Sequence, residues 1–436
     1  MRVKLCCLLI LCAFGLLAAR PSVSGQGRSA PTQEMKVKAF IGARLMDGSN
    51  RPAIDNAVLV VRNGRVIAAG PAKRVRVPAG AEIINLAGKF IIPGLISTHV
   101  HVSDVQGTRP PAYTEENTLR QLGVFARYGI TAVQSLGGEQ APAFKARAAQ
   151  NTPALDRTRL FVAGEIIVGK TPEEARQMVA RVAAAQPDII KIRVDDNLGT
   201  ATKMPPAVYR AVIDEAHRRG LRVAAHIFYL EDAKELLRAG VDFIAHSVRD
   251  REIDDEFIAL MKARHIPYCP TLTRELSAFV YEATPDFFAD PFFLREADRD
   301  VMAQLQEPQR QEAVRQSATA RGYKAALAVA KRNLKKAADA GLLIAMGTDA
   351  GAFANRFQGY FEHVELAMMA EAGLTPAQIL RAATADAARA MKVEGIGTLT
   401  PGAWADFVVL EADPLTDIRN TRRIAAVWIA GNQVKR

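Results

Sequence analysis

His99 and His101 stand two positions apart at the end of a short apolar segment, residues 95–102. Side chains at positions i and i+2 of a β-strand point to the same face, so both imidazoles can reach one cation. Two polar residues that merely close a strand explain such a pair equally well. The pair alone therefore leaves both interpretations open, and the rest of the chain has to decide between them.

Four further residues with metal-binding or proton-transfer chemistry lie in or directly after other apolar segments. They are Lys191, His226, His246 and Asp349. An amine inside an apolar strand is costly unless it is neutral, paired or modified. Reaction with CO2 would convert the Lys191 amine into a carbamate that can bridge two metal ions. The complete set of six residues favours a metal-dependent active site over isolated polar positions.

These residues need a scaffold that gathers the ends of several strands. Eight short apolar segments alternate with amphipathic helical segments, several of which end at a glycine. The segments are 95–102, 130–136, 160–164, 188–193, 222–227, 241–246, 266–271 and 342–348. Because the six candidates lie toward the C-terminal ends of their segments, the pattern predicts an α/β fold, a (β/α)8 TIM barrel with its site at that face.

The flanks of the barrel region follow a different pattern. Short alternating runs separated by turn signals such as Asn63-Gly64 predict strands within 37–92, and the same pattern returns within 405–432. We therefore expect a small β-sandwich domain from residues 36–92 and 400–436, and the barrel from 93–399. An insertion at 273–332 is rich in aromatic residues, which would either form a lid or pack a small core of their own.

The first 25 residues are typical of a secretory signal peptide. Arg2 and Lys4 precede an apolar run at 5–19, and small residues follow, with cleavage expected before Gln26. The mature protein is then periplasmic or secreted, with no stable membrane span after cleavage. Cys269 would be the single cysteine of the mature chain, so no internal disulfide is expected.

The chain of 436 residues has a formal net charge of +11, which raises the question of a nucleic-acid partner. Its basic residues are spread along helical segments without interleaved aromatic residues, which favours solvated helix faces. We expect a small-molecule substrate and no nucleic acid, and association into a homo-oligomer stays open.

Two segments resemble signatures of the amidohydrolase superfamily: 90–101 (FIIPGLISTHVH) and Gly347-Thr348-Asp349-Ala350. The segment 363–384 resembles the imidazolonepropionase-like branch. That branch includes Xaa-Pro and Xaa-Arg/Lys dipeptidases and hydrolases of ochratoxin-type N-acyl amino acids. The resemblance covers residues 36–436 and implies a distorted barrel with a β-sandwich made from both chain ends.

The resemblance also implies a binuclear metal centre. His99, His101 and Asp349 would hold the first Zn2+ ion, and His226 and His246 the second. N6-carboxylated Lys191 would bridge the two ions. The ions would share a hydroxide, and Asp349 would take its proton and pass it to the leaving amine.

Three residues are candidates for substrate contacts. Tyr229 stands near the place where some relatives polarise the scissile carbonyl, Arg193 could bind a substrate carboxylate, and His363 opens a helix after the last strand. The chain departs from many relatives at Gln134-Ser135, where they have an Arg-Asp pair. The substrate therefore does not follow from the resemblance.

The resemblance implies a metal-dependent amidohydrolase that cleaves a dipeptide or an N-acyl amino acid and releases a C-terminal amino acid, and the signal-peptide pattern adds that it is exported. A lactone or cyclic-amide hydrolase would use the same metal cage. A periplasmic metal-binding barrel without activity is the non-enzymatic alternative, and it predicts bound metal without turnover.

Overall fold

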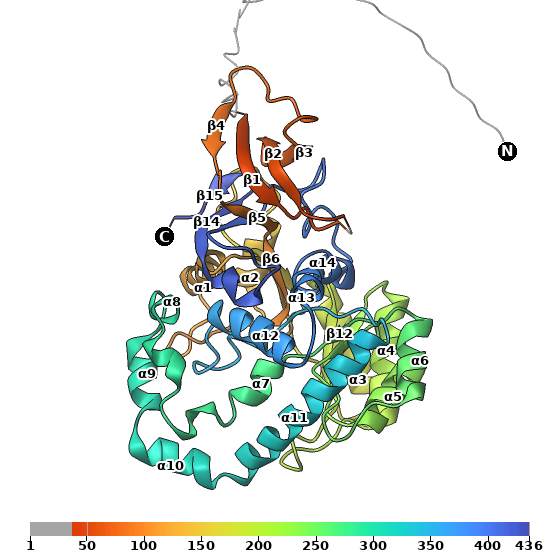
Figure 1. Ribbon diagram of the computed structural model, residues 1–436. Coiled ribbons are helices and arrows are strands. Elements are labelled where there is room, and N and C mark those ends of the chain that lie inside the picture. Colours follow the sequence, from red (N-terminus) through yellow and green to blue (C-terminus); the bar gives the residue numbers. More distant parts are fainter. Residues whose placement is uncertain (1–36, 50, 436) are drawn as a thin grey trace, which may run out of the picture. The chain divides into compact units, whose positions relative to one another are not determined.

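The computed structural model describes residues 37–49 and 51–435, and the predicted signal peptide lies outside these residues. An eight-stranded sheet joins the two ends of the described chain (Figure 1). Its strands follow the order β15-β14-β13-β5-β1-β2-β3, and β4 pairs with β1. The bounds are β1 Lys38–Leu45, β2 Ile54–Arg62, β3 Arg65–Pro71, β4 Glu82–Asn85, β5 Phe90–Pro93, β13 Phe407–Leu410, β14 Ile424–Ile429 and β15 Asn432–Gln433.

Local sequence explains this sheet. Asn63 and Gly64 both have positive φ, at 50° and 74°, which is the conformation that a tight hairpin between β2 and β3 requires. Phe40, Phe407 and Trp428 pack in the sheet's apolar core, with the Phe40 and Phe407 ring centroids 4.9 Å apart. Since Phe40 comes from the N-terminal part and the other two from the C-terminal part, neither end can complete this core alone.

Seven parallel strands form the barrel wall below the sheet in Figure 1. They are β6 Leu95–Val100, β7 Ile130–Ser135, β8 Arg159–Val162, β9 Ile190–Arg193, β10 Val223–His226, β11 Phe243–Ala245 and β12 Tyr268–Cys269. Strands β6 to β8 and β9 to β12 make two sheets. Single bridges between Ile167 and Ile192, Tyr268 and Ile344, and Val100 and Ala350 link these sheets and the segment 342–350 into a ring.

The segment 342–348, which the sequence predicts to be the eighth strand, is not a continuous strand. The amide of Ala345 donates to the carbonyl of Tyr268 on one side, and the amide of Thr98 donates to the carbonyl of Met346 on the other. The segment therefore bonds to β12 and to β6 only at isolated positions, and it forms no continuous series of strand-to-strand hydrogen bonds with either of them. This is the most distorted part of the barrel, and it leads directly into Asp349.

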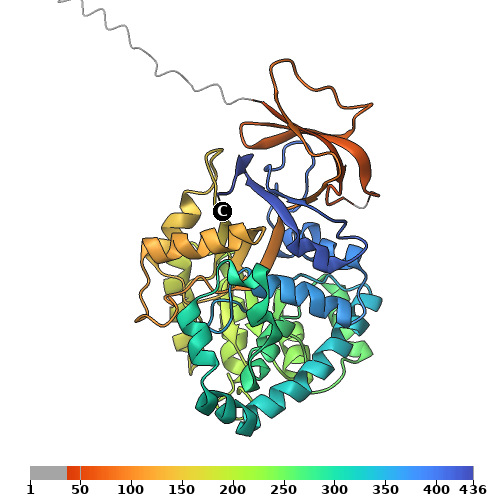
Figure 2. The same ribbon diagram turned by 60° about the vertical axis from the view of Figure 1, so that its left-hand side comes forward.

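Helices cover the outside of the barrel (Figures 1 and 2). They are α1 Glu115–Arg127, α2 Ala141–Ala148, α3 Pro172–Ala184, α4 Pro206–Arg218, α5 Leu230–Ala239, α6 Asp255–Ala263, α11 Ala318–Asp339, α12 Tyr360–Glu371, α13 Pro376–Ala382 and α14 Ala385–Met391. Side chains of Thr114, Thr171 and Asp254 cap α1, α3 and α6 by accepting from backbone amides of the first turn. Within the described part of the chain, no helix has the length and apolar character that a membrane span requires.

The insertion forms a string of short helices before α11. They are α7 Leu272–Leu276, two 3-10 helices at Val280–Glu282 and Asp286–Ala289, α8 Pro291–Leu294, α9 Arg299–Leu305 and α10 Pro308–Gln316. The rings of Phe287 and Phe293 have their centroids 5.1 Å apart, and Phe293 also packs on Phe357 and Tyr360. These contacts favour the second interpretation of its aromatic residues, a core of their own shared with the start of α12.

Candidate active site

A cavity of about 360 Å³ opens at the C-terminal ends of the barrel strands. Its lining includes five of the six residues that the sequence predicts to bind metal: His99, His101, Lys191, His226 and Asp349. The sixth, His246, lies beside them, since its ring centroid is 4.0 Å from that of His226 and 4.5 Å from that of His99. The fold thus brings all six predicted residues together.

Three of these residues place ligand atoms around one point. The Asp349 Oδ1 atom lies 2.9 Å from Nε2 of His101 and 3.3 Å from Nε2 of His99. The Lys191 Nζ atom is 3.3 Å from the same Nε2 of His99. His99, His101 and Asp349 therefore form a group able to hold a metal ion, with the amine of Lys191 next to it.

The protonation states at the site suit metal ligation. Burial lowers the pKa of His99 and His246 well below the usual value, and that of His226 to about 4. These rings are therefore neutral at pH 7 and carry free lone pairs. Nε2 of His246, whose ring packs against those of His99 and His226, is buried without a hydrogen-bond partner among the described residues. A buried orphan nitrogen of this kind fits a divalent cation.

Lys191 and Asp349 are shifted in directions that also suit the site. Burial lowers the pKa of Lys191 to about 8, which makes the neutral amine accessible for reaction with CO2. Burial would raise the pKa of Asp349, but the Arg356 guanidinium and the two histidines outweigh it and hold that pKa well below its usual value. Asp349 is therefore an anion, as a metal ligand has to be.

Contacts behind the ligands orient the imidazole rings. The ring of His101 donates from Nδ1 to the carbonyl of Gly137 at 3.0 Å, which leaves the lone pair of Nε2, beside Oδ1 of Asp349, available to a cation. Nδ1 of His246 lies 2.6 Å from the Thr271 hydroxyl, and Nε2 of His226 lies 3.1 Å from Oδ2 of Asp195. Such contacts fix the tautomer and the orientation of a metal-binding histidine.

Glu139 is a positioning residue that the sequence did not single out. Its buried carboxylate accepts from the Ser135 hydroxyl and from the amides of Gly137, Ala163 and Gly164. It therefore holds the turn whose Gly137 carbonyl orients His101. The sequence signal that could have identified Glu139 is an acidic residue directly after Gly137-Gly138. This segment follows Gln134-Ser135, where the chain departs from many relatives.

The three candidates for substrate contacts have different environments. Arg193 lines the cavity and places Nε 3.3 Å from Oδ1 of Asp195. Tyr229 is not part of this lining, and its hydroxyl donates to Asp196. His363 is buried away from the cavity, with Nε2 2.8 Å from the carbonyl of Tyr128 and Nδ1 3.0 Å from the hydroxyl of Thr421. The structure thus brings Arg193, but not His363, to the metal-binding residues.

Side chains from the insertion complete the cavity. Arg274 and Tyr323 line it, and the Arg274 guanidinium donates to the Tyr323 hydroxyl at 3.0 Å and pairs with the buried Glu275. The Tyr323 hydroxyl in turn donates to Asn197, another lining residue, at 2.7 Å. The spacing of these residues along the sequence does not predict that they meet, because the fold of the insertion brings them to the same cavity.

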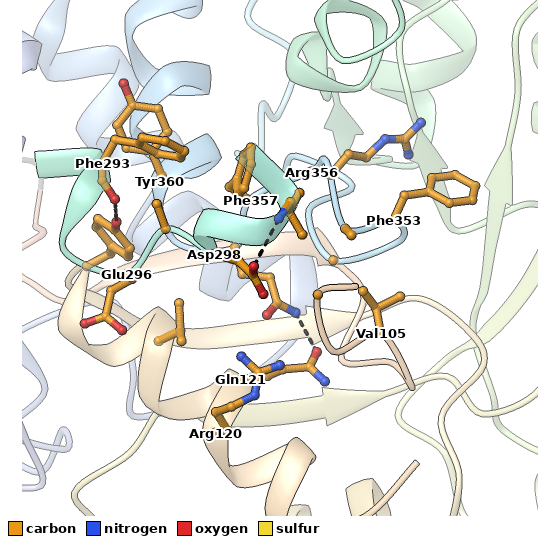
Figure 3. Close-up of a pocket in the computed structure, with 18 residues that line it drawn as sticks. Val105, Arg120, Gln121, Phe293, Glu296, Asp298, Phe353, Arg356, Phe357 and Tyr360 are labelled. Atoms are coloured by element: carbon orange, nitrogen blue, oxygen red, sulfur yellow. Dashed lines mark hydrogen bonds between the residues drawn. The ribbon is translucent and has the colours of Figure 1, made fainter. Parts of the chain in front are cut away.

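A smaller pocket borders the cavity and shares Phe353 and Arg356 with it. Figure 3 shows these two side chains extending together from one loop, away from Gln121 and Glu296. Phe353 is 61% exposed, which is unusual for a large apolar side chain in this structure. Its place at the rim of both pockets makes it a candidate contact for an apolar part of a substrate.

Two buried carboxylates of α12 hydrogen-bond to segments beside the candidate metal-binding residues. Glu362 accepts from the hydroxyls of Ser97 and Thr348, next to His99 and Asp349. Glu365 accepts from the amides of Leu272 and Thr273. Burial raises the pKa of Glu362 to about 7 and that of Glu365 to about 8.

Glu362→Gln is expected to reduce the pH dependence of stability. The folded protein keeps a proton on Glu362 up to about pH 7, whereas the unfolded chain releases it near its ordinary pKa of 4.5. Raising the pH across this window therefore favours unfolding, and glutamine removes that contribution. Melting temperatures at pH 5 and pH 8 should differ less in the variant than in the parent. Equal differences would contradict a raised pKa at this residue.

Residues 90–434 match the model of the amidohydrolase family. An imidazolonepropionase of Deinococcus radiodurans is 24% identical over 401 residues, which are 87% of this chain and 92% of that protein. Uncharacterised proteins of Mycobacterium bovis and Mycobacterium tuberculosis are 26% identical to this chain over 201 residues. The matched part is 44% of this chain and only 53% of the length of those relatives.

Solved structures agree with this fold. A protein of Bifidobacterium longum assigned as a prolidase has a TM-score of 0.74 and 25% identity, over 92% of this chain and 95% of that one. A Xaa-Pro dipeptidase with bound methionine in its active site has a TM-score of 0.73 and 21% identity, over 92% and 100%. These likenesses confirm the predicted fold class, a distorted (β/α)8 barrel with a β-sandwich domain. Since the family model covers most of the chain, the protein belongs to the amidohydrolase family of hydrolases.

Proposed function

We propose that this protein is an exported, metal-dependent hydrolase that cleaves the amide bond of a dipeptide or an N-acyl amino acid. The observation that carries the proposal is the convergence of four histidines, Lys191 and Asp349 at one cavity. His99, His101 and Asp349 would hold one Zn2+ ion, and His226 and His246 the other. Carboxylated Lys191 would bridge them. The prolidase and dipeptidase likenesses support a dipeptide-sized substrate.

When bound, the two metal ions would acidify a water molecule and polarise the scissile carbonyl. Asp349 is ionised, and its carboxylate can accept the proton of the attacking water and pass it to the leaving nitrogen. One water is consumed, the carbon–nitrogen bond breaks, and the nitrogen leaves as a neutral amine. Arg356 pairs with the same carboxylate and holds it toward the histidines, so we assign Arg356 as a positioning residue.

Arg193 supplies the recognition that a C-terminal amino acid needs. Its side chain is 41% exposed, and its one carboxylate contact within residues 37–49 and 51–435, to Asp195, is long at 3.3 Å. A guanidinium with free donors at the cavity wall can bind a substrate carboxylate in a bidentate manner. Arg274 has fewer donors available for a substrate than Arg193, since its guanidinium already pairs with Glu275 and donates to the Tyr323 hydroxyl.

Arg193→Met is expected to raise KM for dipeptides by about 10-fold or more, because it removes a charged hydrogen bond to the substrate carboxylate. The kcat value should change little, and C-terminally amidated dipeptides should be hydrolysed equally by variant and parent. Steady-state kinetics on both substrate forms checks this. An equal loss on amidated substrates would place Arg193 outside carboxylate binding.

A substrate panel tests the proposed activity. The mature protein, supplied with zinc and bicarbonate, should release a C-terminal amino acid from Xaa-Pro, Xaa-Arg or Xaa-Phe dipeptides or from N-acyl-phenylalanine. Chelation should abolish this release, and zinc should restore it. Turnover of lactones or imidazolones alone would overturn amide cleavage of acyclic substrates. Full metal binding with no turnover would favour the non-enzymatic barrel.

Cyclic-amide hydrolysis is the second candidate, favoured by the relative named imidazolonepropionase. Export is a separate part of the proposal and depends on residues 1–25. Expression of the full chain in a Gram-negative host should give a periplasmic protein whose first residue is Gln26. Recovery of the intact N-terminus from the cytosol would overturn export while leaving the activity untouched.

A further inference from the structure

A second large cavity, of about 590 Å³, lies at the opposite end of the barrel. Arg222 and Asp242 directly precede β10 and β11, and they line it together with the end of α6, the segment 265–267 before β12, and the end of α14. All three strands begin at this cavity, whereas the metal-binding residues lie where strands end. The two cavities are therefore on opposite faces, and none of the proposed chemistry uses the second one.

The floor of this cavity is apolar. Met261, Ile266 and Leu342 line it and are each less than a tenth exposed. Its volume falls in the range of about 300–1,000 Å³ that is usual for small-molecule sites. An apolar floor of this size suits the flat or aliphatic body of an organic molecule better than a lone inorganic ion.

The rim is strongly basic. Five basic side chains line the cavity: Arg222, Lys262, Arg264, Arg389 and Lys392. Asp242 is the only acid in the lining, and its carboxylate is already engaged by His217, by the amide of Val223 and by Arg264 of the same rim.

The protein itself compensates only some of the rim cations: Arg264 pairs with Asp242 at 3.5 Å and Arg389 with Asp386 at 3.3 Å. Lys262 and Lys392 are exposed and have no ion pair among the described residues. The Arg222 guanidinium donates to the carbonyls of Ala390 and Met391, at 2.8 and 2.6 Å, which neutralises no charge. Several like charges held around one cavity repel one another, and an anion with more than one charged group would relieve that repulsion.

We propose that this cavity binds a small amphiphilic polyanion, an organic molecule with an apolar body and at least two anionic groups. The body would lie on Ile266 and Leu342, and the anionic groups would pair with Lys262 and Lys392 at the rim. These lysines come from α6 and from the residue after α14, so a ligand with two anionic groups can offer one to each lysine.

Two probes separate charge from apolar contact. 1,5-Naphthalenedisulfonate carries two anionic groups on a flat apolar body, and tripolyphosphate carries charge alone. Titration of the full chain should give saturable binding of one naphthalenedisulfonate per chain and weaker binding of tripolyphosphate. Lys262→Gln/Lys392→Gln should weaken naphthalenedisulfonate binding by about 10-fold, from two lost contacts to charged groups.

Lys73→Gln/Lys170→Gln is the matched control, because both lysines are exposed and lie outside the lining of this cavity. This control variant should bind naphthalenedisulfonate as the parent does. Both double variants should keep the parent's hydrolytic activity. In the parent protein, bound naphthalenedisulfonate should protect Lys262 and Lys392 from chemical acetylation, but not Lys73 and Lys170. Mass spectrometry measures the acetylation of each lysine. Three results would overturn the proposal. They are the lack of saturable naphthalenedisulfonate binding, equally tight binding of tripolyphosphate, and equal weakening of naphthalenedisulfonate binding in both double variants.

Discussion

Lys191→Ala is expected to lower kcat/KM by about three orders of magnitude, the largest catalytic effect that we predict for a substitution at the cavity wall. Lys191 is buried and lies 3.3 Å from the His99 ring, next to Asp349. As a carbamate it would join both metal positions with one anionic group. Alanine removes that group and leaves a space beside the histidines, so metal content measured by mass spectrometry should fall together with activity.

The space left by Lys191→Ala also offers a positive test. Acetate is a small carboxylate that can occupy the place of the carbamate, and it should restore part of both activity and metal content in the variant but not raise them in the parent. Lys145→Ala, at an exposed lysine paired with Glu115, should be indistinguishable from the parent. A fully active, fully metallated Lys191→Ala protein would contradict the bridging role.

Asp406→Ala is expected to cost about 3–5 kcal/mol of folding free energy, the largest stability effect that we predict. Asp406 pairs with Arg159 through two contacts of 2.6 and 3.3 Å, and both side chains are almost fully buried, at 3% and 2% exposure. The carboxylate also accepts from the amide of Ala430. The pair joins the first residue of β8 to the start of β13, and truncating Asp406 leaves the Arg159 charge buried without its partner.

Chemical denaturation with matched variants checks this prediction. Glu252→Ala breaks the exposed pair between Glu252 and Arg332, which are more than half exposed, and should change stability by less than about 1 kcal/mol. Arg159→Met/Asp406→Leu replaces the buried pair with apolar side chains and should recover much of the loss. If Asp406→Ala were as stable as the Glu252 variant, the buried pair would not join the two parts of the fold.

The sequence by itself determined the alternation of strands and helices in the barrel, and it predicted which candidate metal-binding residues the fold brings together. Periodicity is a local property, so apolar segments and glycine stops could be read without knowledge of the fold. The rule that strand ends share one face then brought His226 and His246 to the same place as His99 and His101. Alternating short runs and turn signals at both flanks carried the separate prediction that the two chain ends form one small β-sandwich.

The tertiary structure decided what depends on contacts between distant residues. His363 follows the last strand, yet its ring turns to the carbonyl of Tyr128 and the hydroxyl of Thr421. Arg274 and Tyr323 reach the cavity because the insertion folds back on itself, and Glu139 reaches two loops at once. The segment 342–348 has strand-like sequence but makes only isolated bridges. Side-chain partners of this kind are chosen by packing and backbone path across long separations, which local propensity does not encode.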